Sequence, residues 1–239
     1  RWIFRTIPLS NKMKKNIIKY TLITTGIFIL IIIYLSLIGL DTERFNNQIK
    51  DKVIQKNKNV DLKLKKIRLT LDPLNFKIKA KTIDAKIVYK NKIIELDHIK
   101  TQVSLISFFK DKLISSNLKV LTKSILLKDL VSLVRAIDNR PEVFFLERLI
   151  KKGYVVVNIE MDFDESGNIK NDYKITGSIK DGKINLSKNY NFEKINFLLD
   201  IKNDILDIKN LNFTTNKINF FSENLKITKK ENNLLFEGS

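Results

Sequence analysis

The chain has 239 residues and a formal net charge of +18 at pH 7, with no cysteine and a single histidine, His98. The absence of cysteine excludes disulfides and thiol chemistry, and one histidine is too few for a histidine-based catalytic or metal cluster. The cations are mostly lysines spread evenly along a sequence rich in isoleucine and asparagine, whereas a nucleic-acid site would cluster them, so no nucleic-acid partner is expected.

Residues 21–40 form an uncharged, mostly apolar run that stops at Asp41. As a helix rising about 1.5 Å per residue, this run would be about 30 Å long, which is the hydrocarbon thickness of a bilayer. Cations without any acid precede the run and acids follow it, so the positive-inside rule places the basic residues 1–20 in the cytoplasm and the rest of the chain across the membrane. A cleaved secretory signal is the alternative, but its apolar core would be shorter and would end in a small-residue cleavage site, which this run lacks.

Directly after the apolar run, residues 41–57 are predicted to form a short amphipathic helix near the membrane surface. Asp41 and Thr42 can cap the N-terminus of this helix. Phe45, Ile49 and Val53 recur at steps of four residues and give the helix one narrow apolar stripe. The polar residues that follow end it.

From Val60 onward, apolar residues recur at every second position, which predicts β-strands through residues 58–125. Lys65 and Lys66 shift the phase of this alternation, which then resumes and breaks at Pro73. Turn signals recur roughly every 10–13 residues, which is the spacing of an antiparallel meander.

Residues 126–152 are predicted to form a helical insertion in the β structure. The first helix has one apolar face, which comprises Leu127, Leu130, Val131, Val134 and Ile137. Pro141 opens a second helix, and Gly153 is expected to cap its C-terminus after two lysines. Helices of this kind pack on or across a sheet, so we expect a lid or plug over part of the β structure.

Alternation returns in residues 153–239, which form a second predicted β block. Asp181-Gly182 lies between two alternating runs and is the strongest hairpin signal in the chain, because both positions of such a turn need a positive φ. Asparagine-rich turns are expected near Asn203-Asp204 and near Asn232-Asn233.

None of the motifs that could carry chemistry outweighs its ordinary structural interpretation. Residues 162–168 resemble a calcium loop, but Tyr173 stands where an EF-hand needs a bidentate glutamate. Glu160 and Asp162 lie two residues apart on one strand face, as paired carboxylates can, but nearly all their neighbours on that face are polar. His98 is interpreted as a surface or rim residue. We therefore expect no enzymatic activity, no metal site and no cofactor.

The alternating strands fit two architectures. In the first, the apolar faces of two sheets pair into a closed β-sandwich core, as in many extracellular domains. In the second, one long, curled sheet leaves its apolar concave face uncovered, and that face holds lipid chains. Periodicity alone does not separate these two architectures, because both need one apolar and one polar face on every strand.

The order of the parts resembles the N-terminal region of the AsmA-like family, which includes TamB and YhdP. The resemblance is carried by the anchor at 21–40, by "FNNQIKDKVIQK", by the block that begins "VDLKLKKIRLTLDPLNFKIKAKTIDAKIVYK", and by "RLIKKGYVVVNIEMDFDESG" followed by "ITGSIKDGKINL". It implies a mainly β protein, anchored in the inner membrane with its bulk in the periplasm, whose elongated antiparallel sheet curls into a groove. Family members run to many hundreds of residues, so the chain is expected to be a fragment.

The resemblance further implies that the groove carries phospholipid between the inner and outer membranes or supports outer-membrane biogenesis. Its partners would be membrane phospholipids and an outer-membrane or periplasmic envelope protein. Weak, non-directional contacts suit acyl chains, for which exposure to water costs about 0.8 kcal/mol per CH₂ group. The groove candidates are Val60, Leu62, Leu64, Ile67, Leu69, Leu71, Phe76, Ile78, Ile83, Ile87, Ile175, Ile179, Ile195, Phe197, Leu199 and Ile201. The alternative is an anchored scaffolding protein of the cell envelope with a closed β-sandwich core and no lipid transfer.

Overall fold

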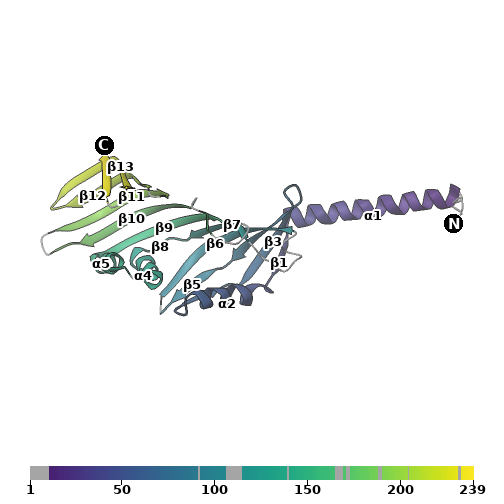
Figure 1. Cartoon of the computed structure of the whole chain (residues 1–239), viewed down its shortest axis with the longest axis horizontal. Coiled ribbons are helices and arrows are strands. Elements are labelled where there is room, and N and C mark those ends of the chain that lie inside the picture. The colour runs from purple at the N-terminus through teal and green to yellow at the C-terminus, as the bar shows by residue number, and fades with distance from the viewer. Residues whose placement is uncertain are drawn as a thin grey trace.

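The computed structural model of the chain contains one large antiparallel sheet, an apolar N-terminal helix that projects from one end of it, and shorter helices packed on the sheet (Figure 1). The structure describes residues 11–90, 92–105, 115–138, 140–164, 169–170, 173–187, 190–203, 205–230 and 233–239. The fold is mainly β, as the alternation of apolar residues predicts. The first half of the basic segment 1–20 and part of the predicted Asn232-Asn233 turn lie outside the described residues.

Two blocks of strands are separated by a pair of helices. The described helices are α1 (Asn11–Leu37), α2 (Asn46–Lys56), α4 (Leu127–Ile137) and α5 (Pro141–Leu149). The first block consists of β1 (Leu40–Thr42), β2 (Val60–Lys63), β3 (Lys66–Asp72), β4 (Lys77–Ile83), β5 (Lys86–Tyr89), β6 (Lys92–Ser104), β7 (Ser115–Thr122) and β8 (Ile125–Leu126). The second block consists of β9 (Ile150–Asp162), β10 (Lys174–Asn185), β11 (Asn191–Lys202), β12 (Ile205–Thr215), β13 (Ile218–Lys230) and β14 (Asn233–Gly238).

The helix α1 is exposed along its apolar length, with none of its most apolar stretch buried by the rest of the chain. It begins ahead of the apolar run 21–40 and ends at Leu37. Gly39, with a φ of +77°, then turns the chain into β1. A side chain at this position would collide with the main-chain oxygen of Leu69, so glycine is required. By length and composition, α1 is able to span a membrane.

The structure corrects the predicted N-terminal cap of α2. Asp41 and Thr42 belong to β1, where the Asp41 carboxylate accepts hydrogen bonds of 2.7 Å and 3.1 Å from the Arg68 guanidinium. Phe45 occupies the cap position of α2 and makes no side-chain hydrogen bond there. The helix is instead held to the sheet by Asn46, whose side-chain amide donates hydrogen bonds to the main chain between β2 and β3.

All described strands belong to one sheet, and all its strand pairs are antiparallel. The order across the sheet is β1-β3-β4-β6-β7-β9-β10-β11-β12-β13-β14. Three short strands lie off this path: β5 pairs with β6, β2 pairs with β5, and β8 pairs with β9. From β9 to β14, each strand pairs with the next one along the chain. The prediction of an antiparallel sheet is thus confirmed. A closed β-sandwich needs a second sheet, and the described strands form none.

Two predictions that involve glycines are wrong: the hairpin at Asp181-Gly182 and the helix cap at Gly153. Asp181-Gly182 forms no hairpin, because β10 continues through these residues and its registers with β9 and β11 shift there. Asp181 has a φ of +52°, so the positive φ expected of a turn serves a β-bulge. Gly153 does not cap α5, which ends at Leu149; it lies in β9 with a φ of +139°. The turn predicted at Asn203 is confirmed between β11 and β12.

Replacing Gly153 by alanine is expected to lower the free energy of unfolding by about 1–3 kcal/mol, the cost of holding a residue with a side chain in this sparsely populated conformation. The added Cβ atom would also lie only 3.0 Å from the Cα atom of Gly182. Urea unfolding followed by circular dichroism measures the change. Gly238→Ala is the matched control, since the nearest atom to its Cβ would lie at 3.5 Å. Equal stability of the two variants would contradict the prediction.

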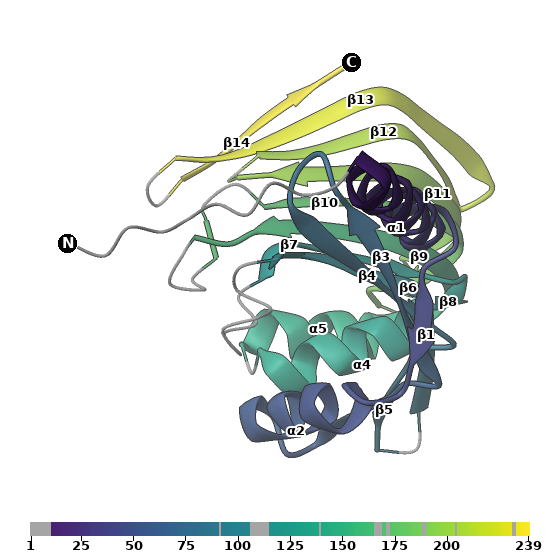
Figure 2. The same cartoon turned by 90° about the vertical axis from the view of Figure 1, so that its right-hand side faces the viewer.

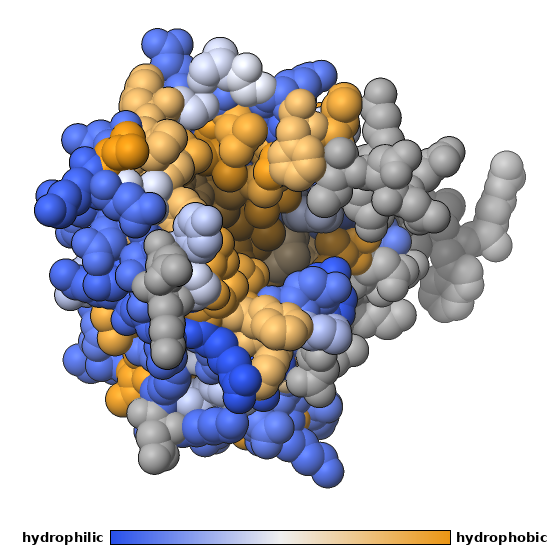
Figure 3. Space-filling model, turned by 90° about the vertical axis from the view of Figure 1, so that its left-hand side faces the viewer, coloured by the Kyte–Doolittle hydropathy of each residue, from blue (hydrophilic) through white to orange (hydrophobic). Residues whose placement is uncertain are grey.

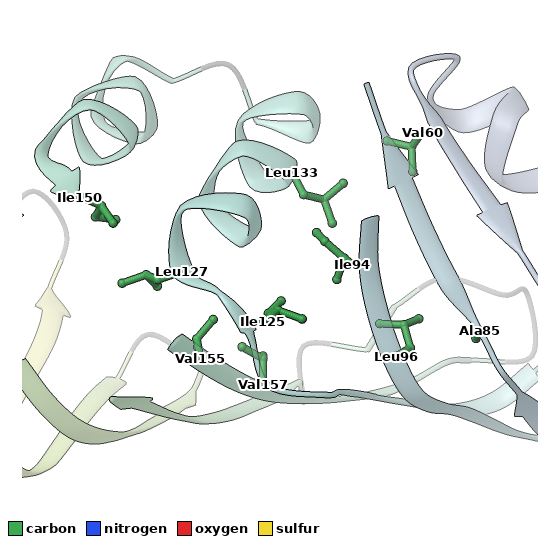
Figure 4. Close-up of a cluster of buried hydrophobic side chains, with 10 residues drawn as sticks. All are labelled: Val60, Ala85, Ile94, Leu96, Ile125, Leu127, Leu133, Ile150, Val155 and Val157. Carbon is green, nitrogen blue, oxygen red and sulfur yellow. The ribbon is translucent and has the colours of Figure 1, made fainter. Parts of the chain in front are cut away.

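The helices α2, α4 and α5 pack on one face of the sheet, which we call the inner face; the opposite face is the outer face (Figure 2). A cluster of buried apolar side chains, the core cluster, lies between helices and strands. It comprises Val60, Ala85, Ile94, Leu96, Ile125, Leu127, Leu133, Ile150, Val155 and Val157 (Figure 4). The predicted helical insertion therefore packs on the sheet and supplies part of the core.

Candidate functional site

The inner face is apolar across most of the sheet, because the registers of successive strands align apolar residues in rows. One row crosses seven consecutive neighbours in the order β6, β7, β9, β10, β11, β12 and β13, and ends on β14. Its members are Ile99, Val120, Ile159, Ile175, Ile201, Leu206, Ile227 and Phe236. Directly paired residues of antiparallel strands point to the same side. Because Ile99, Val120 and Ile159 pack against the core cluster, the whole row lies on the inner face.

A group of phenylalanines extends the inner face across β11, β12 and β13. The ring of Phe192 meets that of Phe213 edge to face with centroids 5.4 Å apart, and Phe213 stacks on Phe220 at 5.1 Å. Phe192 pairs with Ile184 of β10, which packs against the core cluster, so these rings lie on the inner face. Phe220 nevertheless remains 44% exposed. The inner face is therefore apolar at these strands without being sealed.

The helices cover only part of the inner face. α4 packs against β6, β8 and β9, α5 packs against β9, and α2 packs against β2. No described helix makes a comparable contact with β11 to β14, and Ile218, Phe220 and Phe236 are exposed there. Figure 3 shows the result, since hydrophobic residues on this side of the molecule surround a hollow. An apolar surface thus stays open to solvent.

The outer face of the same sheet is polar and rich in cations. On β3, β4, β6 and β7, side chains line a shallow depression of about 400 Å³. Its cationic residues are Arg68, Lys79, Lys81, Lys100 and Lys119. Acids offset part of this charge: Lys119 donates a hydrogen bond of 3.0 Å to Glu160, and this bond lowers the pKa of the Glu160 carboxyl. The two faces of the sheet therefore differ sharply in polarity.

One polar network lies among the helices. The Lys92 ammonium donates a hydrogen bond of 2.7 Å to the Ser132 hydroxyl, which in turn bonds to the Glu147 carboxylate. The bonds from Ser132 and from Arg135 lower the pKa of Glu147. A serine beside a lysine can act as a nucleophile beside its base, but the Lys92 ammonium also forms an ion pair with the Asp129 carboxylate at 2.9 Å. The network ties α4 and α5 to β6, and the described residues contain no cluster of three metal-binding side chains.

The registers place all but two of the predicted groove candidates on the inner face. Those on it are Val60, Leu62, Leu64, Ile67, Leu69, Leu71, Ile78, Ile87, Ile175, Ile179, Ile195, Phe197, Leu199 and Ile201. Four of them are buried and belong to the protein's core: Val60, Leu62, Ile67 and Ile195. The others are partly exposed, and the candidates of β10 and β11 lead from the core cluster to the open part of the face.

The two exceptions have different causes. Phe76 lies in the turn between β3 and β4 with a φ of +50°, where strand alternation no longer applies. Ile83 pairs with Lys66 on the outer face. The adjacent inner position belongs to Thr82, which is buried and whose hydroxyl accepts a 2.8 Å hydrogen bond from the main-chain N–H of Ile99. Because Thr82 is polar although it points to the inner face, the alternation of apolar residues in the sequence does not show which residues of β4 face inward.

Several inner-face residues of β12 and β13 are absent from the predicted candidates. They are Leu206, Ile208, Leu211, Phe213, Ile218, Phe220, Leu225 and Ile227. The same two-residue alternation marks each stretch of them and could have found them. The phase changes at Asn210, whose φ of +52° interrupts the alternation between Ile208 and Leu211.

Three features define the candidate site: the open apolar part of the inner face on β11 to β14, the cationic outer face of the first block, and the exposed apolar stretch of α1. Together they form an amphipathic sheet joined to a helix that is able to cross a membrane. No protein-family model, no curated protein and no solved structure matches the chain.

Proposed function

We propose that the chain is a membrane-anchored carrier of phospholipid, which holds acyl chains on the open inner face of β11 to β14. The observation that carries the proposal is an apolar sheet face that the described helices leave uncovered, in a chain whose first helix has an apolar stretch that the rest of the chain does not bury. Monomeric soluble proteins rarely expose large contiguous apolar patches unless these bind a partner. Acyl chains are a fitting partner, since each CH₂ group removed from water contributes about 0.8 kcal/mol.

The side chains of the open face favour a lipid over a ligand that requires hydrogen bonds or ion pairs. Isoleucine, leucine and phenylalanine offer weak contacts without hydrogen bonds, so an acyl chain can lie on them in many positions. A charged headgroup would stay in water at the rim of the sheet. In this proposal the sheet forms the elongated, curled groove of the AsmA-like type, and the chain belongs to that family.

We also propose that α1 lies in the inner membrane, with its N-terminus in the cytoplasm and the sheet in the periplasm. Lys12, Lys14 and Lys19 precede the apolar run, whereas Asp41 and Glu43 follow it, and this asymmetry supports the orientation. Membrane phospholipid is then both the cargo and the surroundings of the anchor. An outer-membrane or periplasmic envelope protein would receive the lipid, or the carrier would otherwise support outer-membrane biogenesis.

Site-specific photo-crosslinking tests the proposal with neighbouring residues of one strand. Phe220 faces inward and is 44% exposed, whereas Phe221 faces outward and is 66% exposed. With a benzophenone amino acid at position 220 of the full chain in cell membranes, we expect a phospholipid adduct by mass spectrometry. The same probe at position 221 is the matched control and should give none, although it is the more exposed of the two.

Equal lipid adducts at the two positions, or none at either, would reject lipid carriage on the inner face. The anchored scaffold is the competing function, and it predicts protein adducts at the strand edges without lipid on either face. Because both probes sit on β13, differences in expression or membrane insertion cannot account for a difference between them.

A further inference from the structure

The turn that joins β3 and β4, residues 73–76, presents two large apolar side chains to the surroundings. Leu74 is 90% exposed and Phe76 is 70% exposed. Phe76 also has a φ of +50°, a conformation that is uncommon for a bulky residue and that glycine adopts without cost. Phe76 therefore does not contribute to the core, and its side chain does not favour the backbone conformation of the turn. A contact with something outside the chain would explain its presence.

Several hydrogen bonds hold this turn in place. The Asp72 carboxylate pairs with Lys79 at 2.8 Å and accepts hydrogen bonds from the main chain and side chain of Asn75. The bonds from Lys79 and Asn75 lower the pKa of Asp72 to about 2, so the carboxylate is charged at neutral pH. The main-chain oxygen of Phe76 accepts a 2.9 Å bond from Leu105. The exposed side chains thus stand on a fixed hairpin.

The turn lies beside the C-terminal end of α1. β1 follows α1 and pairs antiparallel with β3, Leu40 opposite Leu69, so β3 runs back towards α1 as it approaches the turn. At about 3.3 Å per residue, the turn reaches about 10–15 Å beyond Leu69. Figure 1 and Figure 2 both show the β3–β4 hairpin next to this end of α1.

The last turns of α1 are also where a membrane surface would lie. The apolar run ends at Leu40 and charge begins at Asp41. Tyr34 is exposed near this end of the helix, and tyrosine is enriched at membrane–water interfaces. Lys77 directly follows the turn, where a cation is attracted to anionic headgroups. With α1 across a bilayer, the turn stands at the headgroup level of the same bilayer.

We propose that residues 73–76 form a second membrane contact, in which Leu74 and Phe76 insert among the headgroups of the bilayer that α1 crosses. The proposal rests on the membrane anchoring by α1 in the proposed function. Leu71 and Ile78 pair with each other on the inner face directly behind the turn. The inserted turn therefore connects the lipid surface to the apolar inner face, and an acyl chain that leaves the bilayer at this point avoids a passage through water.

A fluorescence experiment on the full chain in phospholipid vesicles tests this contact. The sequence has no cysteine, so Leu74→Cys gives a single site for an environment-sensitive NBD label. We expect blue-shifted emission and strong quenching by lipids that carry a nitroxide close to the headgroup. Lys217→Cys, in the turn between β12 and β13, is the matched control and should show neither effect. Water-like, unquenched emission at position 74 overturns the proposal.

A second variant separates insertion from mere proximity to the anchor. Phe76→Asp in the Leu74→Cys background should weaken the quenching, because a carboxylate is driven out of the apolar layer; unchanged quenching overturns the role assigned to Phe76. Quenching at 74 without a lipid adduct at 220 supports the membrane contact and rejects lipid carriage, whereas an adduct at 220 without quenching at 74 does the reverse. A chain that fails to float with the vesicles overturns both.

Discussion

Replacing Leu199 and Phe220 together by aspartate is expected to slow phospholipid transfer between vesicles at least about tenfold while leaving the fold intact. Both side chains lie on the inner face and neither is buried, so the unfolding free energy should change little. A bound acyl chain, in contrast, would have to desolvate two carboxylates, each at a cost of about 1–3 kcal/mol or more. Since 1.4 kcal/mol corresponds to a factor of about ten, transfer should fall at least about tenfold.

The control for this variant uses the neighbouring residues on the same two strands. Leu198 and Phe221 point outward and are well exposed, so Leu198→Asp with Phe221→Asp adds the same charge to the other face. Transfer of a fluorescent phospholipid from donor to acceptor vesicles should proceed at the native rate with this control. Similar losses in both double variants would show that net charge, not the inner face, governs transfer. Circular dichroism of each variant checks its fold.

Ile94→Ala is expected to lower the free energy of unfolding by about 2–5 kcal/mol, the cost of losing a buried isoleucine side chain and leaving a cavity. Ile94 is 1% exposed and belongs to the core cluster between β6 and α4. Its neighbour Ile93 is 58% exposed on the opposite face, so Ile93→Ala removes the same atoms from a surface and should change stability by about 0.5 kcal/mol or less.

The measurement is urea unfolding of the full chain in detergent, followed by the β signal in circular dichroism. A similar loss of stability in the two variants would mean that the helices do not seal the inner face at β6. The comparison also tests the division of that face into a covered part, near α4 and α5, and an open part on β11 to β14.

The sequence predicts the strand content, the helical insertion and the polarity of the two sheet faces, because each of these follows from local periodicity. It fails where periodicity and backbone conformation conflict. Asp181 has a positive φ, which a hairpin turn at Asp181-Gly182 would need, but a bulge also accommodates this conformation, and only the pairing with β9 and β11 shows that the strand continues. Gly153 is similarly predicted to cap a helix, although it lies in β9 with a φ of +139°, a conformation that glycine adopts far more readily than other residues.

The candidate face could be predicted only in part. Its residues are marked by alternation, yet the phase of the alternation resets at Asp84 and at Asn210, both of which have a positive φ. Which part of the face stays uncovered depends on where α4 and α5 pack, and this is a long-range property that no local pattern encodes. The break at Pro73 is predicted and separates β3 from β4, but Phe76 is wrongly expected in a strand, because it fits the strand alternation while lying in the turn.

The rows of the inner face have a kinetic consequence for any chain-like hydrocarbon that lies across them. Neighbouring strands lie about 4.8 Å apart, so such a molecule contacts a chemically similar side chain on each strand it crosses. The residues that face inward in this row are all aliphatic from β10 to β13: Ile175, Ile201, Leu206 and Ile227. A shift of the hydrocarbon by one strand therefore replaces a contact with one aliphatic side chain by a contact with another. The energy profile along the track is therefore nearly flat, which favours fast one-dimensional diffusion without an inbuilt direction. If the sheet carries phospholipid as proposed, net flow would follow the concentration gradient between the two ends.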